Sequence, residues 1–386
     1  MPPLSGISRT MGIVIAVIVV IAIIGGVLAW WITAQQQKPQ KLVYVVIGKS
    51  VHPYWSVVEA GTKKAGEDLK KQGVNVEAVF WVPSKEDVQA QLSTMDSYIA
   101  QNVAGIAIAP SDPSAATPYI NKALEKGIPV ITIDTDAPNS NRLAYLGTGN
   151  WKAGYLAGLT AYHFAKEKGY IKPGATVKIA MLTGSLTAMN SLERMDGFKK
   201  AIEDCVKADP DIKGNINLVW LGPYNDQEDP TQALNLALSV LQSHPDLHIA
   251  FGVYAYDGPA WARALEQSGI PPGKVVLIEF DVTSDNVPPL QKGYALATIG
   301  QRQYFMGYYG VMLLYNITKM GRDAALKQLI PNYPSNKIYD TGVDIVATRH
   351  IEFTAPTGEK VTILSLDEYK QLAQQLGIDP KLLGLS

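Results

Sequence analysis

The chain has 386 residues, of which 47% are hydrophobic, and its formal net charge at pH 7 is −1. This length indicates two domains rather than one, and the absence of basic clusters argues against nucleic acid as a partner. The single cysteine, Cys205, excludes an intrachain disulfide and a zinc site built from thiolates. Because Cys205 lies among helix formers, we interpret it as a packing residue and not as a nucleophile.

The first element in the chain is an apolar segment, MGIVIAVIVVIAIIGGVLAWWI, over residues 11–32. It contains no charged residue and is long enough to cross a bilayer as one helix. Residues 1–33 are therefore predicted to be a membrane anchor, with a cleaved secretory signal sequence as the alternative. The polar stretch AQQQKPQK (34–41) indicates a linker. Under both interpretations the rest of the chain is extracytoplasmic: anchored to the cell membrane, or secreted if the segment is cleaved.

From residue 42 onward, apolar runs alternate with helical patterns. We predict strands at 42–48, 75–81, 104–109, 129–133 and 143–146, then at 176–182, 216–221, 248–253, 274–280 and 295–300. We predict helices at 56–72, 86–101, 114–126 and 151–168, then at 188–207, 230–243, 258–268, 303–320 and 366–376. Strand and helix in alternation imply an α/β fold with parallel sheets covered by helices on both faces, and two such series imply two doubly wound lobes.

Polar and aromatic residues follow most of the predicted strands. In doubly wound sheets, ligands bind outside the carboxyl ends of the strands. These ends offer carboxylates, amides and phenols without a basic cluster. Carboxylates accept hydrogen bonds from hydroxyls, and flat rings cover the apolar face of a pyranose. The pattern therefore predicts a site for a neutral, hydroxyl-rich molecule, with Tyr54 and Trp55 of VHPYW (51–55) as its aromatic platform.

An ordered set of motifs then resembles a known family: HPYW, QAQL…AQNVAGIAIAPSDPSA (89–115), GIPVITIDTD (127–136), ERMDGF (193–198), VVLIEFD (275–281) and ATIGQ (297–301). Over residues 41–350 the chain resembles the periplasmic sugar-binding proteins of the ribose/galactose type, which serve ABC importers. The resemblance implies two lobes joined by three hinge crossings. The N-terminal lobe would take 41–148 and 303–333, and the C-terminal lobe 149–302 and 334–355. Residues 356–386 would be a C-terminal extension, for which the sequence offers no function.

The resemblance also implies ligand-binding positions. Its aromatic pair, its two strand-end aspartates and its hinge glutamine match Tyr54, Trp55, Asp134, Asp281 and Gln301. Three further candidates are Asn190, His52 and Asp257, although Asp257 within Asp-Gly-Pro is equally a helix start. The sequence departs from ribose-type members at Leu192, where they have an arginine, which puts ribose itself in doubt.

Several other residues are interpreted as structural. Lys49 is expected to be an exposed, solvated lysine, and Asp136 a turn residue. Asp226 and Asp229 are expected to begin the following helix, and the aromatic stripe 304–309 to pack at the hinge. The stretch GTGNWKAG (147–154) is not a dinucleotide loop, because Lys152 occupies the place of its third glycine. The histidines at 52, 163, 244, 248 and 350 do not form a plausible metal set.

We therefore predict a monomeric solute-binding protein that captures a sugar or sugar-like ligand between two lobes and delivers it to an ABC permease. No metal, cofactor or catalytic residue is expected. One alternative is a polyol, a furanosyl signal molecule or a nucleoside as the ligand of the same fold, and another is a ligand-binding sensor ectodomain. A hydrolase or isomerase would need an acid and a base at one bond, and the strand ends offer no obvious pair.

Overall fold

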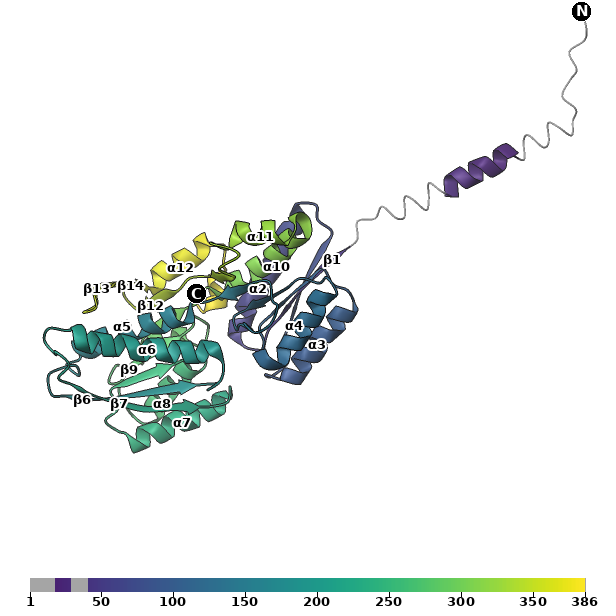
Figure 1. The fold of residues 1–386 in the computed structure, drawn as a ribbon. Coiled ribbons are helices and arrows are strands. Elements are labelled where there is room, and N and C mark those ends of the chain that lie inside the picture. The colour runs from purple at the N-terminus through teal and green to yellow at the C-terminus, as the bar shows by residue number, and fades with distance from the viewer. Residues whose placement is uncertain (1–17, 29–40, 386) are drawn as a thin grey trace, which may run out of the picture. The chain divides into compact units, whose positions relative to one another are not determined.

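The computed structural model describes residues 18–28 and 41–385. Residues 18–28 form a helix with exposed side chains, and the other residues of the predicted anchor and linker, apart from Lys41, lie outside the described residues. Of the helices within 18–28 and 41–385, none combines the length and apolar character that a membrane span requires. The main body begins at β1 (Figure 1).

The first sheet has six strands in the order β11-β5-β4-β3-β1-β2. The strands are β1 (Leu42–Ile47), β2 (Val76–Trp81), β3 (Gly105–Ile108), β4 (Val130–Ile133), β5 (Tyr145–Gly147) and β11 (Ile338–Asp340). The β1–β3, β3–β4, β4–β5 and β5–β11 pairs are parallel. The associated helices are α2 (Pro53–Lys71), α3 (Val88–Ala100), α4 (Pro113–Glu125), α10 (Gln303–Met320) and α11 (Arg322–Leu329). Side chains such as Val45 and Ile47 pack toward α3 and α4, which explains the continuous apolar runs of these strands.

The second sheet has eight strands in the order β13-β14-β12-β10-β9-β8-β6-β7. They are β6 (Thr176–Thr183), β7 (Asn217–Asn225), β8 (Ile249–Gly252), β9 (Val276–Phe280), β10 (Ala295–Gly300), β12 (Asp344–Ala347), β13 (Ile351–Thr354) and β14 (Lys360–Ser365). The helices are α5 (Asn150–Glu167), α6 (Met189–Ala208), α7 (Pro230–Ser243), α8 (Asp257–Gln267), α9 (Val287–Gln291) and α12 (Leu366–Gln375), followed by the 3-10 helix η1 (Pro380–Leu383). All strand pairs from β7 to β10 are parallel, whereas β12 runs antiparallel to β10.

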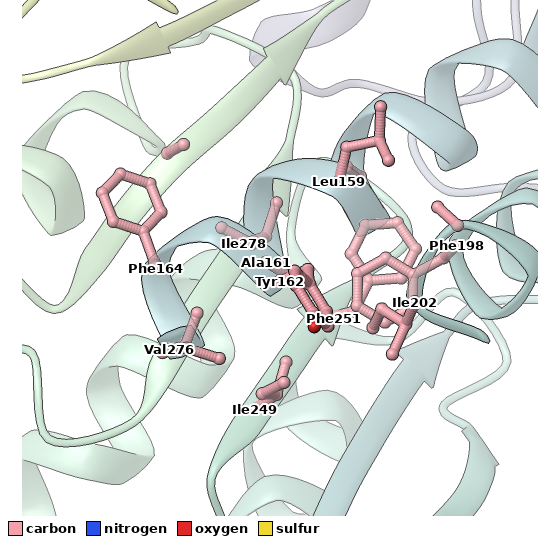
Figure 2. Close-up of a cluster of buried hydrophobic side chains, with 14 of the residues drawn as sticks. Leu159, Ala161, Tyr162, Phe164, Phe198, Ile202, Ile249, Phe251, Val276 and Ile278 are labelled. Carbon is pink, nitrogen blue, oxygen red and sulfur yellow. The ribbon is translucent and has the colours of Figure 1, made fainter. Parts of the chain in front are cut away.

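Both faces of the second sheet are buried. Ile179 and Met181 of β6 belong to a core with α5 and α6, whereas Ala180 and Leu182 belong to a core with α7 and α8. In the first of these cores the rings of Phe198 and Phe251 stack with their centroids 4.2 Å apart. Both side chains are labelled in Figure 2. The predicted packing role of the lone cysteine is confirmed, because Cys205 is fully buried in this core and burial raises the pKa of its thiol to about 12.

Close approach of helices α5 and α6 depends on glycine. A Cβ on Gly154 would lie 2.1 Å from the carbonyl oxygen of Arg194, so the two backbones touch at this point.

Each strand and helix predicted for residues 42–320 is present, and helix 366–376 corresponds to α12. The α/β class with two parallel-sheet lobes is therefore confirmed. The elements α9, α11, β11–β14 and η1 were not predicted.

The chain passes between the two sheets three times: after β5, after β10, and between β11 and β12. The third passage differs from the predicted boundary at 333, because β11 still pairs with β5 of the first sheet. The predicted separation of 356–386 as an extension is also wrong, because β14 lies between β12 and β13 within the second sheet. β13 and β14 alternate in exposure along most of their length and lack a continuous apolar run, so they gave no clear sequence signal.

Candidate ligand-binding site

The carboxyl ends of the two sheets face a shared cavity of about 250 Å³. Seven of the eight residues predicted from the sequence line it: His52, Tyr54, Trp55, Asp134, Asn190, Asp281 and Gln301. The others in its wall include Lys49, Glu86, Arg194, Glu228, Tyr254 and Tyr256. The rule that doubly wound sheets bind ligands at strand carboxyl ends therefore located this cavity in both lobes.

The aromatic pair lies in the first turn of α2. His52 is the N-cap residue, and its Nδ1 accepts a hydrogen bond from the backbone N–H of Tyr54 at 3.2 Å, while Pro53 occupies the first helical position. The Tyr54 and Trp55 rings meet edge to face at 5.0 Å. Gly48 leaves room for the indole, since a Cβ there would lie 2.6 Å from Cε3 of Trp55. This local geometry fixes both rings at the cavity wall.

Asp134 follows β4 and is held from several directions. Its Oδ1 accepts a hydrogen bond from the Tyr54 hydroxyl at 2.6 Å, and its backbone carbonyl accepts one from the Tyr145 hydroxyl at 2.7 Å. Its backbone adopts a φ of +57°, a strained conformation for a non-glycine residue. Lys49 Nζ lies 3.8 Å from Asp134 Oδ2, and only 5% of Lys49 is exposed. The expectation of a solvated Lys49 is therefore wrong. Pairing with Asp134 offsets the free-energy cost of burying the Lys49 ammonium.

A network in the second lobe centres on Arg194. Its guanidinium donates hydrogen bonds to Asn150 Oδ1 at 2.9 Å, to the Val253 carbonyl at 3.0 Å and to Gln301 Oε1 at 3.0 Å. It also lies over the Phe280 ring at 3.9 Å. Because Asn150 and Gln301 belong to two different hinge crossings, Arg194 ties these crossings to the cavity wall.

Asp281 follows β9 as Asp134 follows β4. Its Oδ1 accepts a hydrogen bond from Gln301 Nε2 at 2.7 Å, and its φ is +75°. Burial raises the pKa of Asp281 to about 7, with Arg194 and the Gln301 hydrogen bond opposing the rise and Asp134 adding to it. This carboxyl therefore changes its charge near neutral pH.

Asn190 and Tyr254 face each other in the second lobe. The Tyr254 hydroxyl donates to Asn190 Oδ1 at 3.3 Å, and the backbone N–H of Ser191 donates to the same oxygen at 3.0 Å. Tyr254 lies in the segment that follows β8.

The structure differs from the prediction at Asp257. This residue begins α8, is fully buried outside the cavity lining, and accepts a hydrogen bond from the backbone N–H of Tyr254 at 2.8 Å. It therefore positions Tyr254 instead of facing the cavity. Nearby, Asp226 accepts from the Tyr256 hydroxyl at 3.1 Å, and burial raises the pKa of Asp226 to about 6. Asp229, as expected, is the N-cap of α7.

His52 of the first lobe contacts the second lobe at the cavity wall. Its ring meets that of Tyr256 edge to face at 6.3 Å. Burial lowers the pKa of His52, and the charge of Asp285 in the second lobe opposes this effect. The neutral imidazole is therefore the favoured form at neutral pH.

Sequence reasoning missed Glu86 and Arg194. Glu86 lies in the loop before α3, and its Oε2 is buried without a hydrogen-bond partner among the described residues. Its sequence context, SKEDV, gave no signal beyond that of a helix start. Arg194 was visible within ERMDGF, but its partners are distant in sequence.

A cavity shared by the carboxyl ends of two hinged, doubly wound lobes defines a two-lobed solute-binding protein. The comparison with known families agrees: residues 43–323 match the periplasmic binding protein domain, and the chain belongs to this family.

Relatives and solved structures extend the likeness. The ribose import binding protein of Haemophilus influenzae is 24% identical over 298 residues, covering 77% of this chain and 92% of the relative. GanP, a glucose-galactose binding protein from Geobacillus stearothermophilus, is 29% identical with a TM-score of 0.64, covering 80% of this chain and 98% of that one. An ABC transporter solute binding protein from Burkholderia graminis, in complex with D-arabinose, is 27% identical with a TM-score of 0.66, covering 81% and 96%.

Proposed function

We propose that the chain is an extracytoplasmic solute-binding protein that captures a sugar between its lobes and delivers it to an ABC importer. One observation carries this proposal: a single cavity combines the rings of Tyr54 and Trp55 with the carboxylates of Asp134 and Asp281, from opposite lobes. Rings cover the apolar face of a pyranose, and carboxylates accept hydrogen bonds from its hydroxyls. The relatives named above, whose names or titles refer to sugars, support the same ligand class.

The charges in the cavity wall favour a neutral guest. Lys49 is paired with Asp134, and the Arg194 guanidinium is engaged by three protein oxygens. Neither cation is therefore available as a full partner for an anionic ligand. The cavity volume of about 250 Å³ lies below the range of about 300–1,000 Å³ for drug-sized ligands, which suits a monosaccharide.

Capture would follow from lobe closure. In this proposal the lobes rotate about the three crossings, and only the closed arrangement places both walls against the guest. A ligand that touches both lobes shifts the population toward closure, because it binds that state more tightly. Release to the permease would then require reopening, and the sugar would leave chemically unchanged.

The apolar segment 11–32 would anchor the chain to the membrane, and residues 34–41 would act as its tether. We base this part of the proposal on the sequence, which has 22 uncharged residues in a row there. An anchored protein stays within reach of a neighbouring permease. Cell fractionation of the full chain, with and without residues 1–33, tests the anchor separately from binding.

The ligand is tested with a panel on the purified full chain: D-ribose, D-allose, D-xylose, D-arabinose, D-glucose and D-galactose, with adenosine and myo-inositol as the non-sugar arms. At about 100 times Kd, a true ligand adds about 2.7 kcal/mol of stability and raises Tm. Isothermal titration calorimetry then gives Kd. The proposal of a sugar ligand fails if no sugar raises Tm. A response to adenosine or myo-inositol alone would instead assign the ligand to the nucleosides or the polyols.

A pair of tryptophan variants separates the cavity from the surface. Trp55→Ala removes a ring that is 5% exposed in the cavity wall, whereas Trp151→Ala removes one that is 42% exposed outside it. We expect Trp55→Ala to weaken sugar binding by roughly tenfold to a hundredfold, in line with about 1.5–3 kcal/mol for a large apolar side chain. Trp151→Ala should leave Kd unchanged. Equal effects of the two variants would contradict the proposed site.

A further inference from the structure

The C-terminal strap, residues 366–385, contacts both lobes. Its buried side chains form one apolar cluster with residues of the first lobe and of the second. From the strap, the cluster contains Tyr369, Ala373, Ile378, Leu383 and Leu385. From the lobes, it contains Val57 and Tyr304 on one side and Val282, Val287 and Val346 on the other.

The strap is fixed to the second lobe. It continues directly from β14, which is a strand of the second sheet, and α12 packs against β12 and β14. The α12 N-terminus is closed by a capping box, in which Ser365 Oγ accepts from the backbone N–H of Glu368 at 3.2 Å. At the other end, the backbone at Gly384 lies against Ser284, since a Cβ on Gly384 would be 2.7 Å from the Ser284 Cα.

The strap also reaches the first lobe. Its last element, η1, is in direct contact with α2. Leu383 is 2% exposed and Leu385 5% exposed, and both share the cluster with Val57 of α2 and Tyr304 of α10. Val57 follows Trp55 by two positions and Val282 directly follows Asp281, so the cluster adjoins the cavity wall in both lobes.

We propose that the strap stabilises the closed arrangement of the lobes. The described structure corresponds to the closed arrangement, since the His52 ring of the first lobe meets the Tyr256 ring of the second at 6.3 Å. In this proposal, rotation toward the open arrangement moves α2 relative to the segment that follows Asp281 and removes the contact between the strap and α2. Opening therefore exposes apolar surface of Leu383 and Leu385, which water disfavours. An interaction present in one arrangement only shifts the population toward it, so the strap increases the apparent affinity for sugar. This last consequence rests on the proposed function, whereas the lobe equilibrium itself does not.

The test measures the lobe equilibrium without any sugar. Spin labels on Ser97→Cys in the first lobe and Ser243→Cys in the second report the distance between lobes by pulsed electron resonance. Both positions are exposed, and the natural Cys205 is fully buried and does not compete for label. The strap is weakened by Leu383→Ala with Leu385→Ala in the full chain, and Lys381→Ala, an exposed residue of the same helix, is the matched control.

We expect the double variant to shift the ligand-free distance distribution toward the open form, and Lys381→Ala to match the parent. Identical distributions for the double variant and the control overturn the proposal, whatever the sugar panel gives. If D-galactose or another panel sugar binds, its Kd should rise roughly tenfold in the double variant, equivalent to about 1.4 kcal/mol. If the double variant does not fold, Leu385→Ala alone is measured in the same way, with cooperative melting as the criterion of folding.

Discussion

Sugar binding should weaken sharply as the pH falls from 8 to 6, because of Asp281. Burial raises the pKa of this carboxyl to about 7 in the ligand-free protein. The group is enclosed by Arg194 and Gln301, which favour its ionised form, and by Asp134, which disfavours it. A sugar hydroxyl donates to a carboxylate, whereas a protonated carboxyl has lost part of its acceptor capacity. The ionised form is therefore the binding-competent one.

The expected magnitude follows from the titration. With a pKa of about 7, roughly nine-tenths of Asp281 is ionised at pH 8 and roughly one-tenth at pH 6. Kd should therefore rise roughly tenfold between these two pH values, which is about 1.4 kcal/mol. Because binding selects the ionised form, it should also release a fraction of a proton at pH 6.

Calorimetry at several pH values, in buffers of different ionisation enthalpy, measures both Kd and the proton release. Asp281→Asn should bind more weakly at pH 8 but lose the pH dependence. Asp226→Asn is the control, since burial raises the pKa of Asp226 to about 6 but this residue lies outside the cavity lining. The reasoning is refuted if the parent shows a flat Kd, or if Asp281→Asn keeps the full pH dependence.

The remaining predictions concern packing and charge. Gly48→Ala should displace the Trp55 indole, whose Cε3 would lie 2.6 Å from the new Cβ, and weaken sugar binding by roughly tenfold in calorimetry, equivalent to about 1.4 kcal/mol. Phe251→Ala, in the fully buried ring stack of Figure 2, should lower the free energy of unfolding by about 3–5 kcal/mol in a urea titration. Arg194→Met should move the midpoint of the Kd–pH profile above 7, because it removes the cation that favours ionised Asp281; an unmoved midpoint contradicts this. Asp281→Asn should raise the free energy of unfolding at pH 8, because ionised Asp281 destabilises the folded state. The folded-state pKa of Asp281, about 7, exceeds the ordinary value of 3.8. The contribution of this carboxyl to the free energy of unfolding therefore falls by up to about 4 kcal/mol as the pH rises from about 4 to 7.

Most of the fold could be predicted from the sequence for a physical reason. Parallel strands are buried on both faces, so they appear as continuous apolar runs such as LVYVVI and GIAI, which are hard to mistake. The edge elements β11–β14 could not be found in this way. β13 and most of β14 alternate in exposure and show no continuous apolar run, so their pairing depends on neighbours supplied by the rest of the chain.

The residues of the site also divide into those that the sequence could place and those that it could not. Asp134, Asp281 and Gln301 could be placed because each directly follows a strand whose carboxyl end must face the cleft. Lys49 was misjudged, and for Asp257 the sequence left ligand contact and helix start equally open, because the burial of both depends on partners. Lys49 is neutralised by Asp134, which is distant in sequence, while Asp257 binds the backbone N–H of Tyr254. Periodicity carries no information about which charge a folded chain brings to which partner.

The two lobes present their carboxylates through the same strained backbone. Asp134 follows β4 of the first sheet with a φ of +57°, and Asp281 follows β9 of the second with a φ of +75°. Such conformations cost of order 1–3 kcal/mol each in non-glycine residues and persist only where the surroundings enforce them. Here Tyr54 and Tyr145 hold Asp134, while Gln301 holds Asp281. The fold thus accepts backbone strain in both lobes at the two carboxyls that line the cavity, so each carboxyl is held in position before a ligand binds.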